Sequence, residues 1–131
     1  MHETDMTKAL IQTVRDWWES QPDRPQIDTI HLIVGQFTCV EPASLQFAFE
    51  VQTRETFLDS AKLQIRETPL IAYCLNCQQE YAPDIGLQYA CPKCRSPMQE
   101  IRSGRELKVD RIEYTSENKT LNKTPETTFS A

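Results

Sequence analysis

The stretch CLNCQQEYAPDIGLQYACPKC, residues 74–94, decides how this chain folds. It begins with one Cys-x-x-Cys unit, Cys74 and Cys77, and after thirteen intervening residues it ends with a second, Cys91 and Cys94. Each unit can wrap a tight turn so that both sulfurs face one ion, and two units supply four thiolates in a tetrahedron. Soft thiolates suit zinc. Because all four positions are cysteine, none is left for water, and the spacing predicts a closed, structural zinc site.

Two other uses of such cysteines are a redox dithiol pair and an iron–sulfur cluster. A redox motif needs a single Cys-x-x-Cys, usually at a helix start within a strand–helix–strand unit, so the second pair argues against it. The fifth cysteine, Cys39, has no partner at metal-binding spacing. We expect Cys39 to be a small buried apolar residue rather than a reactive thiol.

The residues around the cysteines differ in character from the rest of the chain. Cysteine, proline, glutamine and tyrosine replace aliphatic residues, so a segment of this size cannot build a core and needs a metal as a staple. We therefore expect residues 69–102 to form a zinc-binding domain inserted into a larger domain made of residues 1–68 and 103–115. The polar segment 116–131 is expected to be a disordered tail.

Hydrophobic periodicity outlines the larger domain. Apolar residues recur at helical spacing over residues 4–19, and a second helix is expected over 42–54, where Pro42 suits the first helical position. Alternating patterns predict strands over 27–34, 61–67 and 105–114. The fold class is therefore α+β: two helices packed on a three-stranded sheet, with an inserted zinc-ribbon-like module. Strand 27–34 is apolar on both faces, which predicts a central position in the sheet.

Composition excludes several classes of protein. The chain has 131 residues and a formal net charge of −5, and its isoelectric point is about 5.0. A nucleic-acid binder usually shows a basic face, so no nucleic-acid partner is expected. No apolar run is long enough to cross a bilayer, so no membrane association is expected. The first residues have no basic region followed by an apolar run, so we expect no signal peptide and a cytoplasmic location.

The amino terminus, Met1-His2-Glu3, is a second candidate metal site. The free α-amine, the His2 imidazole and the intervening amide nitrogens lie within one short chelate. Ni²⁺ and Cu²⁺ bind such nitrogen-rich sites tightly, because they favour tetragonal geometry and stand high in the affinity order. Glu3 or a water can fill a remaining position. The alternative is that a histidine at the second position is chance. The other histidine, His31, lies in an apolar strand, and we expect it to be a satisfied core residue rather than a ligand.

These features occur together in a known family. The chain resembles the HypA/HybF family of hydrogenase nickel-incorporation proteins over residues 1 to about 114. The motifs that carry the resemblance stand in this order along the sequence: Met1-His2-Glu3, Gly35-Gln36-Phe37, the run Val40-Glu41-Pro42-x-x-Leu45-x-Phe47-x-Phe49-Glu50, the four cysteines, and Ser103-Gly104-Arg105-Glu106-Leu107. After the third residue the chain has Thr4-Asp5-Met6 where many members have a Ser-Leu run, a departure that leaves the ligands intact.

The resemblance implies a metallochaperone rather than an enzyme. It implies Ni²⁺ as cargo on Met1, His2 and Glu3, and structural Zn²⁺ on Cys74, Cys77, Cys91 and Cys94. It also implies two partners, a HypB-type nickel GTPase and the precursor of the large subunit of nickel–iron hydrogenase; some members also serve urease and its accessory proteins.

Two functions of other classes fit parts of the sequence. A zinc-ribbon adaptor that mediates protein–protein binding would use the cysteines without the amino terminus. A thiol oxidoreductase would need unoccupied thiols, so one tightly held zinc per chain would exclude it.

Overall fold

The computed structural model describes residues 3–116 and 119–123. Both helices and all three strands expected of the larger domain are present, with ends that differ by a few residues from the sequence-based expectation. The elements in chain order are α1 (Glu3–Ser20), β1 (Gln26–Gly35), η1 (Gln36–Thr38), α2 (Pro42–Thr53), β2 (Lys62–Thr68), β3 (Ile71–Cys74), β4 (Gln79–Tyr81), η2 (Ile85–Leu87), β5 (Glu100–Ser103), β6 (Leu107–Ser116) and β7 (Lys119–Lys123).

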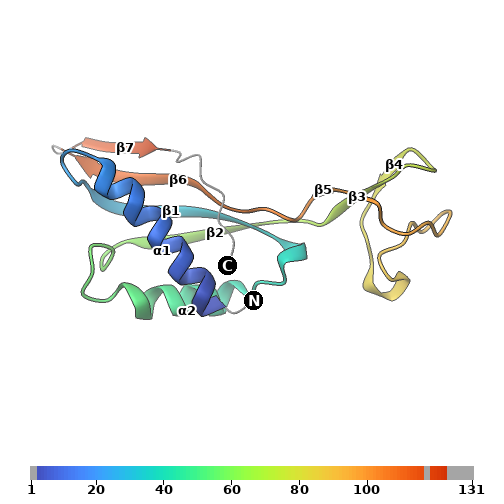
Figure 1. Cartoon of the computed structure of the whole chain (residues 1–131), viewed down its shortest axis with the longest axis horizontal. Coiled ribbons are helices and arrows are strands. Elements are labelled where there is room, and N and C mark those ends of the chain that lie inside the picture. Colours follow the sequence, from blue (N-terminus) through green and yellow to red (C-terminus); the bar gives the residue numbers. More distant parts are fainter. Residues whose placement is uncertain (1–2, 117–118, 124–131) are drawn as a thin grey trace. The chain divides into compact units, whose positions relative to one another are not determined.

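The chain divides into two compact units (Figure 1). We call the first the helical unit; it comprises Met1–Ile33, Val40–Arg66 and Leu107–Ala131. We call the second the cysteine unit; it comprises Val34–Cys39 and Glu67–Glu106. The predicted class, α+β with an inserted four-cysteine module, is confirmed.

The helical unit is built on a four-stranded sheet in the order β2-β1-β6-β7. The central position predicted for β1 is confirmed, since it pairs on both sides. Helix α1 runs diagonally across the sheet and its first turn meets α2 (Figure 1). Neither of the described helices is long and apolar enough to cross a membrane. The apolar core side chains, all at most 5% exposed, are Met6, Leu10, Val14, Ile27, Ile30, Leu32, Ile33, Leu45, Phe49, Leu58, Leu63, Val109 and Ile112.

The fourth strand, β7, was not predicted from the sequence. It pairs antiparallel with β6, with Ile112 opposite Lys123 and Ser116 opposite Lys119. It lies within the segment 116–131 that we expected to be a disordered tail. The rest of that segment beyond Ser116, residues 117–118 and 124–131, lies outside the described residues.

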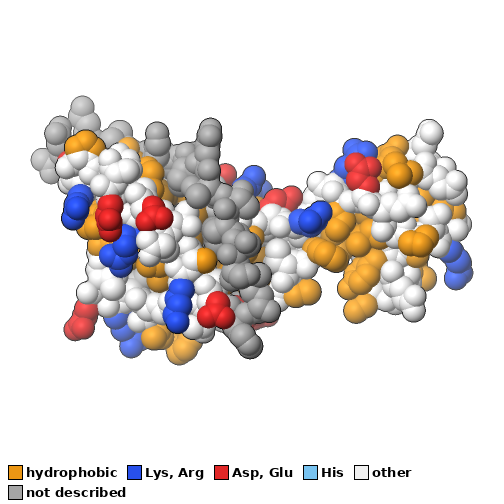
Figure 2. Space-filling model, viewed as in Figure 1, with side chains coloured by type: hydrophobic (Ala, Val, Ile, Leu, Met, Phe, Trp, Pro, Cys, Tyr) orange, Lys and Arg blue, Asp and Glu red, His pale blue; other side chains and the backbone are white. Residues whose placement is uncertain are grey.

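The cysteine unit contains a three-stranded sheet in the order β4-β3-β5, antiparallel throughout. Among its described side chains, the buried apolar ones are only Val34, Ala72, Cys74 and Cys91. Larger apolar residues such as Leu75 and Ile85 are 56% and 76% exposed, and hydrophobic side chains are spread over the surface of this unit (Figure 2). So small an apolar core cannot offset the conformational entropy of the segment, so the unit needs a cross-link.

Candidate metal centre

The two Cys-x-x-Cys units form two matching turns. In the first turn, the Gln78 amide donates to the Cys74 carbonyl at 2.7 Å. In the second, the Arg95 amide donates to the Cys91 carbonyl at 2.8 Å. Gln78 and Arg95 both have a left-handed backbone, with φ of 55° and 62°. A non-glycine residue in this region is uncommon, so the same unfavourable conformation at both corners shows that each turn is fixed to aim two sulfurs inward.

The four sulfurs converge on one point. All four lie within 4.8 Å of one another, with Cys74 Sγ and Cys94 Sγ 3.5 Å apart and Cys91 Sγ and Cys77 Sγ 3.9 Å apart. These distances are too long for a disulfide, in which the sulfurs are about 2.05 Å apart. A regular tetrahedron with a metal–sulfur distance of ~2.3 Å has edges of about 3.8 Å. Both of these sulfur pairs are close to this edge length, so the cluster fits one tetrahedral zinc ion.

The protonation of the cluster also suits a cation. Hydrogen bonds from the side chains of Asn76 and Ser96 lower the pKa of Cys94 to about 5. Backbone hydrogen bonds, first from Cys94, lower the pKa of Cys91. The pKa of Cys77 is raised to about 12, chiefly by its hydrogen bond with Cys94. Hydrogen bonds within the cluster thus already favour the thiolate form of Cys91 and Cys94, which is the form that binds a metal ion.

The candidate nickel ligands stand at the start of α1. Met1 and His2 lie outside the described residues, and Glu3 is the first residue of the helix. The side-chain hydroxyl of Thr7 donates to the Glu3 carbonyl at 2.6 Å, so the first turn is closed. The first N–H groups of an α-helix have no acceptor within the helix, so the backbone nitrogen of Glu3 is not committed to helical hydrogen bonding.

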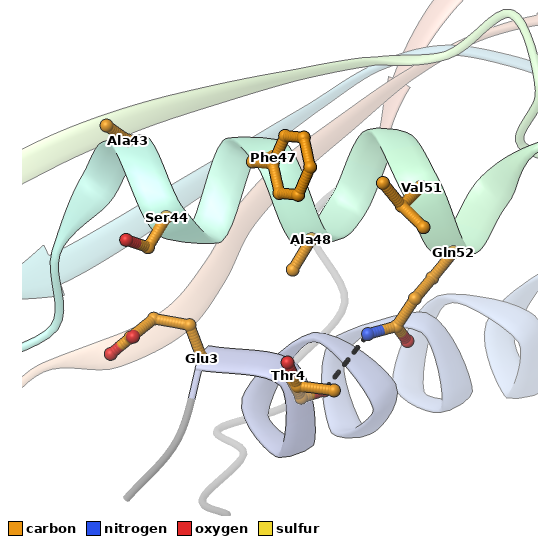
Figure 3. Close-up of a pocket in the computed structure, with 8 residues that line it drawn as sticks. All are labelled: Glu3, Thr4, Ala43, Ser44, Phe47, Ala48, Val51 and Gln52. Atoms are coloured by element: carbon orange, nitrogen blue, oxygen red, sulfur yellow. Dashed lines mark hydrogen bonds between the residues drawn. The ribbon is translucent and has the colours of Figure 1, made fainter.

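A groove of about 530 Å³ lies beside this helix start (Figure 3). Glu3 and Thr4 line it from α1, and the side-chain amide of Gln52 donates to the Thr4 carbonyl at 3.2 Å, which ties α1 to α2. Phe47 lines it from α2 and is 67% exposed. Phe47 stands outside the buried stripe of α2, and this is the one sign of the groove in the sequence.

His31 has a partner, as expected of a histidine that is not a ligand. Its Nε2 donates to Glu113 Oε2 at 3.0 Å, between β1 and β6. This hydrogen bond is the main cause of a lowered pKa at Glu113. Among the described residues, only the four cysteines form a group of three or more potential metal ligands.

The expectation that Cys39 is buried is wrong. Cys39 is exposed and has a left-handed backbone, with φ of 58°, at the end of η1. The lack of a partner at metal-binding spacing suggested a core position, but the side chain lies at the surface.

Three segments of the cysteine unit meet at a junction that we define as residues 35–37, 68–70 and 103–106. Gly35 N donates to the Glu106 carbonyl at 2.6 Å and Phe37 N to the Gly104 carbonyl at 2.8 Å. The Gln36 side-chain carbonyl accepts from Leu70 N at 3.1 Å. The two short motifs Gly35-Gln36-Phe37 and Ser103-Gly104-Arg105-Glu106 are therefore in contact, although 65 residues lie between them in the sequence.

The chain is similar to known proteins in both sequence and fold. A family model described as "Hydrogenase/urease nickel incorporation, metallochaperone, hypA" matches residues 1–114. The chain is 70% identical over 114 residues to the guanidine hydrolase-activating protein A of Synechocystis sp., covering 87% of this chain and 95% of that protein. It is 67% identical over 125 residues to the hydrogenase maturation factor HypA of Synechococcus sp., covering 95% of each.

The solution structure of the Ni metallochaperone HypA from Helicobacter pylori has a similar fold. Its TM-score is 0.64 at 22% sequence identity, with 89% of this chain and 100% of that chain covered. At this identity the likeness bears on the fold alone, and it agrees with the α+β architecture described above.

Proposed function

This chain belongs to the HypA family of hydrogenase and urease nickel-incorporation metallochaperones, and from this we propose that it binds Ni²⁺ at Met1, His2 and Glu3 and delivers it to an enzyme under assembly. The single observation that supports the site most directly is the start of α1 at Glu3. Because the helix begins there, the Glu3 amide nitrogen has no helical acceptor and can join the α-amine and the His2 imidazole in one chelate.

The chemistry of this chelate favours Ni²⁺ and Cu²⁺ over harder divalent ions, and the family points to nickel. Nitrogen ligands in a plane suit tetragonal ions, whereas Mg²⁺ and Ca²⁺ prefer oxygen. The amine in this proposal is that of Met1. No substrate bond is made or broken, so the protein acts as a carrier, and we place it in the cytoplasm.

The zinc on Cys74, Cys77, Cys91 and Cys94 has a structural role in this proposal. The cluster offers no open position for water or cargo. It holds the fold of the cysteine unit, whose apolar core is small, and it stays loaded while nickel comes and goes.

Two clients are supported by the relatives. The first is the large-subunit precursor of nickel–iron hydrogenase, reached with the help of a HypB-type GTPase, since the 67% identical relative is a hydrogenase maturation factor. The second is a guanidine hydrolase, since the 70% identical relative is named for activating one. The two identities are too close to favour either client.

The nickel site is tested by titrating Ni²⁺ into the zinc-loaded protein and three altered forms. His2→Ala and acetylation of the α-amine should each abolish nickel binding while one zinc per chain remains. His31→Ala is the matched control, because it removes the other histidine from a strand, and it should bind nickel as the wild type does. Unchanged nickel binding after His2→Ala would exclude the amino-terminal site.

The identity of the client is tested by measuring nickel transfer. Nickel-loaded protein is mixed separately with purified metal-free guanidine hydrolase and with purified hydrogenase large-subunit precursor, and nickel is measured in each recipient after separation. Transfer to one recipient alone identifies the client. Transfer to neither, with nickel bound as proposed, would contradict delivery to these two enzymes.

A further inference from the structure

One side of α2 is apolar and exposed next to the start of α1. Phe47 is 67% exposed and Val51 is 43% exposed, one helical turn apart. Both line the groove of about 530 Å³ that Glu3 enters from α1. A phenylalanine exposed to this extent beside a second apolar residue is more than a scattered surface residue, because the groove joins them in one patch.

The spacing of this face suits a second helix. Ala43, Phe47 and Val51 form one ridge with a spacing of four residues. Ser44, Ala48 and Gln52 form a parallel ridge on the side that faces the start of α1 (Figure 3). Ridges at this spacing accept the ridge of another helix at a crossing angle of about −50°. The small side chains of Ala43, Ser44 and Ala48 leave the space that such a ridge needs.

The charges around the groove are mainly negative. Glu3 is the one charged residue among those that line it, and no lysine or arginine does. Glu50, which is exposed, stands on α2 directly before the groove residue Val51. A groove with a carboxylate and no cation in its lining favours a partner whose apolar residues are flanked by lysine or arginine.

The size of the face points to a transient contact. The twelve residues of α2 extend about 18 Å, and one helix is about 10 Å wide, so the face covers on the order of 200 Å². A stable interface takes roughly 800 Å² from each partner. A stable dimer with a second copy of this chain therefore needs far more surface than this face supplies. A transient complex between a carrier and its recipient can form on a smaller surface.

We propose that this face of α2, with Phe47 as its centre, binds a basic amphipathic helix of the protein that receives the nickel. This inference rests on the proposed function, since it places the recipient beside the amino-terminal chelate. A recipient held there brings its own ligands close to the ion. Nickel transfer then depends on the high effective concentration of those ligands, and no separate diffusional encounter is needed.

The test uses the full-length, zinc-loaded protein and two synthetic amphipathic helices with the same leucine spacing, one with lysine and one with glutamate on the polar face. We expect the lysine peptide to bind and the glutamate peptide not to bind. Phe47→Ser should weaken lysine-peptide binding about tenfold or more, because truncation of a central aromatic anchor has effects of this size. Ile85→Ser is the matched control: it removes an equally exposed apolar side chain from the cysteine unit and should leave binding unchanged.

The role of negative charge beside the groove is tested by a second pair of matched variants. Glu50→Lys should weaken lysine-peptide binding, whereas Glu19→Lys, at the other end of α1, should have a smaller effect. Equal losses in both variants would show that only the net charge matters and would overturn the proposal. Tight self-association of the wild type that Phe47→Ser abolishes would assign the face to a second copy and would also overturn it.

Measurements of nickel binding and transfer distinguish a failure of this inference from a failure of the proposed function. Phe47→Ser should bind nickel as the wild type does but transfer it more slowly to whichever recipient accepts it. If the variant binds nickel and transfers it at the wild-type rate, the docking face is wrong and the chelate stands. If the wild type binds no nickel at its amino terminus, the proposed function fails whatever the peptides show.

Discussion

Gly35 and Gly104 are in contact through their backbones. A Cβ added at Gly35 would lie 2.1 Å from both the carbonyl carbon and the carbonyl oxygen of Gly104. The backbone of Gly35 is extended, with φ of −80°, so any residue could adopt its conformation. Glycine is needed here because there is no room for a side chain. At Gly104, φ is +108° and an added Cβ would lie 2.6 Å from Leu70 Cα, so both space and conformation require glycine.

Gly35→Ala should destabilise the protein by about 2 kcal/mol or more, because the added methyl group meets backbone that cannot rotate away. Urea unfolding of the zinc-loaded protein measures the loss. Gly86→Ala is the control, since the added Cβ would lie 3.3 Å from Asp84 Oδ1, the end of a side chain that can move. A Gly35→Ala variant as stable as Gly86→Ala would show that the junction opens at little cost.

The junction explains motifs that the sequence could only match to a family. Gly35-Gln36-Phe37 and Ser103-Gly104-Arg105-Glu106 are short and carry no chemistry of their own. Their meaning is a backbone contact between distant segments, and no periodicity or spacing in one sequence reveals such a contact. The role of the four cysteines, in contrast, could be predicted from the sequence. The Cys-x-x-Cys spacing predicts a local turn in each unit, and one ion shared by both units predicts that the two turns are in contact.

Removing zinc should release the two cysteine turns. The amides of Gln78 and Arg95 are bound to carbonyls within those turns, and we expect both to lose hydrogen-exchange protection when the metal is chelated. Amides in the middle of α1 should stay protected, because the core of the helical unit contains no cysteine. Gln78 and Arg95 amides that stayed protected without metal would show that the turns form unaided.

Replacing single cysteines should distinguish the cluster from the exposed thiol. Cys74→Ser should reduce zinc well below one per chain, because a tetrahedral site loses one of its four thiolates. Cys39→Ser should leave zinc content unchanged, since Cys39 is not part of the cluster. Elemental analysis after gel filtration measures both, and zinc loss in Cys39→Ser would contradict the assignment.

The His31–Glu113 pair should make stability depend on pH. The hydrogen bond from His31 lowers the pKa of Glu113 below its ordinary value of 4.5. A lowered carboxyl pKa stabilises the folded state above that ordinary value, and the stabilisation is lost as pH falls through the lower folded value. Glu113→Gln should therefore lower the Tm near neutral pH, and the difference from wild type should shrink below about pH 4. Glu19→Gln, on the exposed side of α1, should show no such trend.

Nickel binding should weaken on acidification. The chelate requires a neutral amine and a neutral imidazole, whose ordinary pKa values are about 8 and about 6.5. Below both values at least two protons must leave for each ion bound, so the nickel Kd should rise about a hundredfold or more per pH unit. Titrations at several pH values on wild type and His31→Ala should give the same slope. A Kd that did not change with pH would exclude nitrogen ligands.

Most of the helical unit could be predicted from the sequence, and the reasons differ by element. Helix α1 and strand β2 each have one core face, which appears in the sequence as a periodic pattern of apolar residues. Strand β1 is apolar on both faces, which indicates its central position. β7 escaped prediction because its residues, Lys-Thr-Leu-Asn-Lys, are polar except for Leu121, and it forms an edge of the sheet. Cys39 was misplaced because a left-handed turn at a non-glycine residue has no sequence signal.

The start of α1 at Glu3 has a consequence for any cation held just before it. The amino-terminal end of a helix carries a partial positive charge, which opposes a nearby cation by ~0.3–1 kcal/mol. Glu3 and Asp5 in the first turn offset part of that opposition. Under the proposed function, the helix that anchors the chelating residues also repels their cargo. A receiving enzyme then needs ligands only modestly stronger than an amine and an imidazole to draw the ion away.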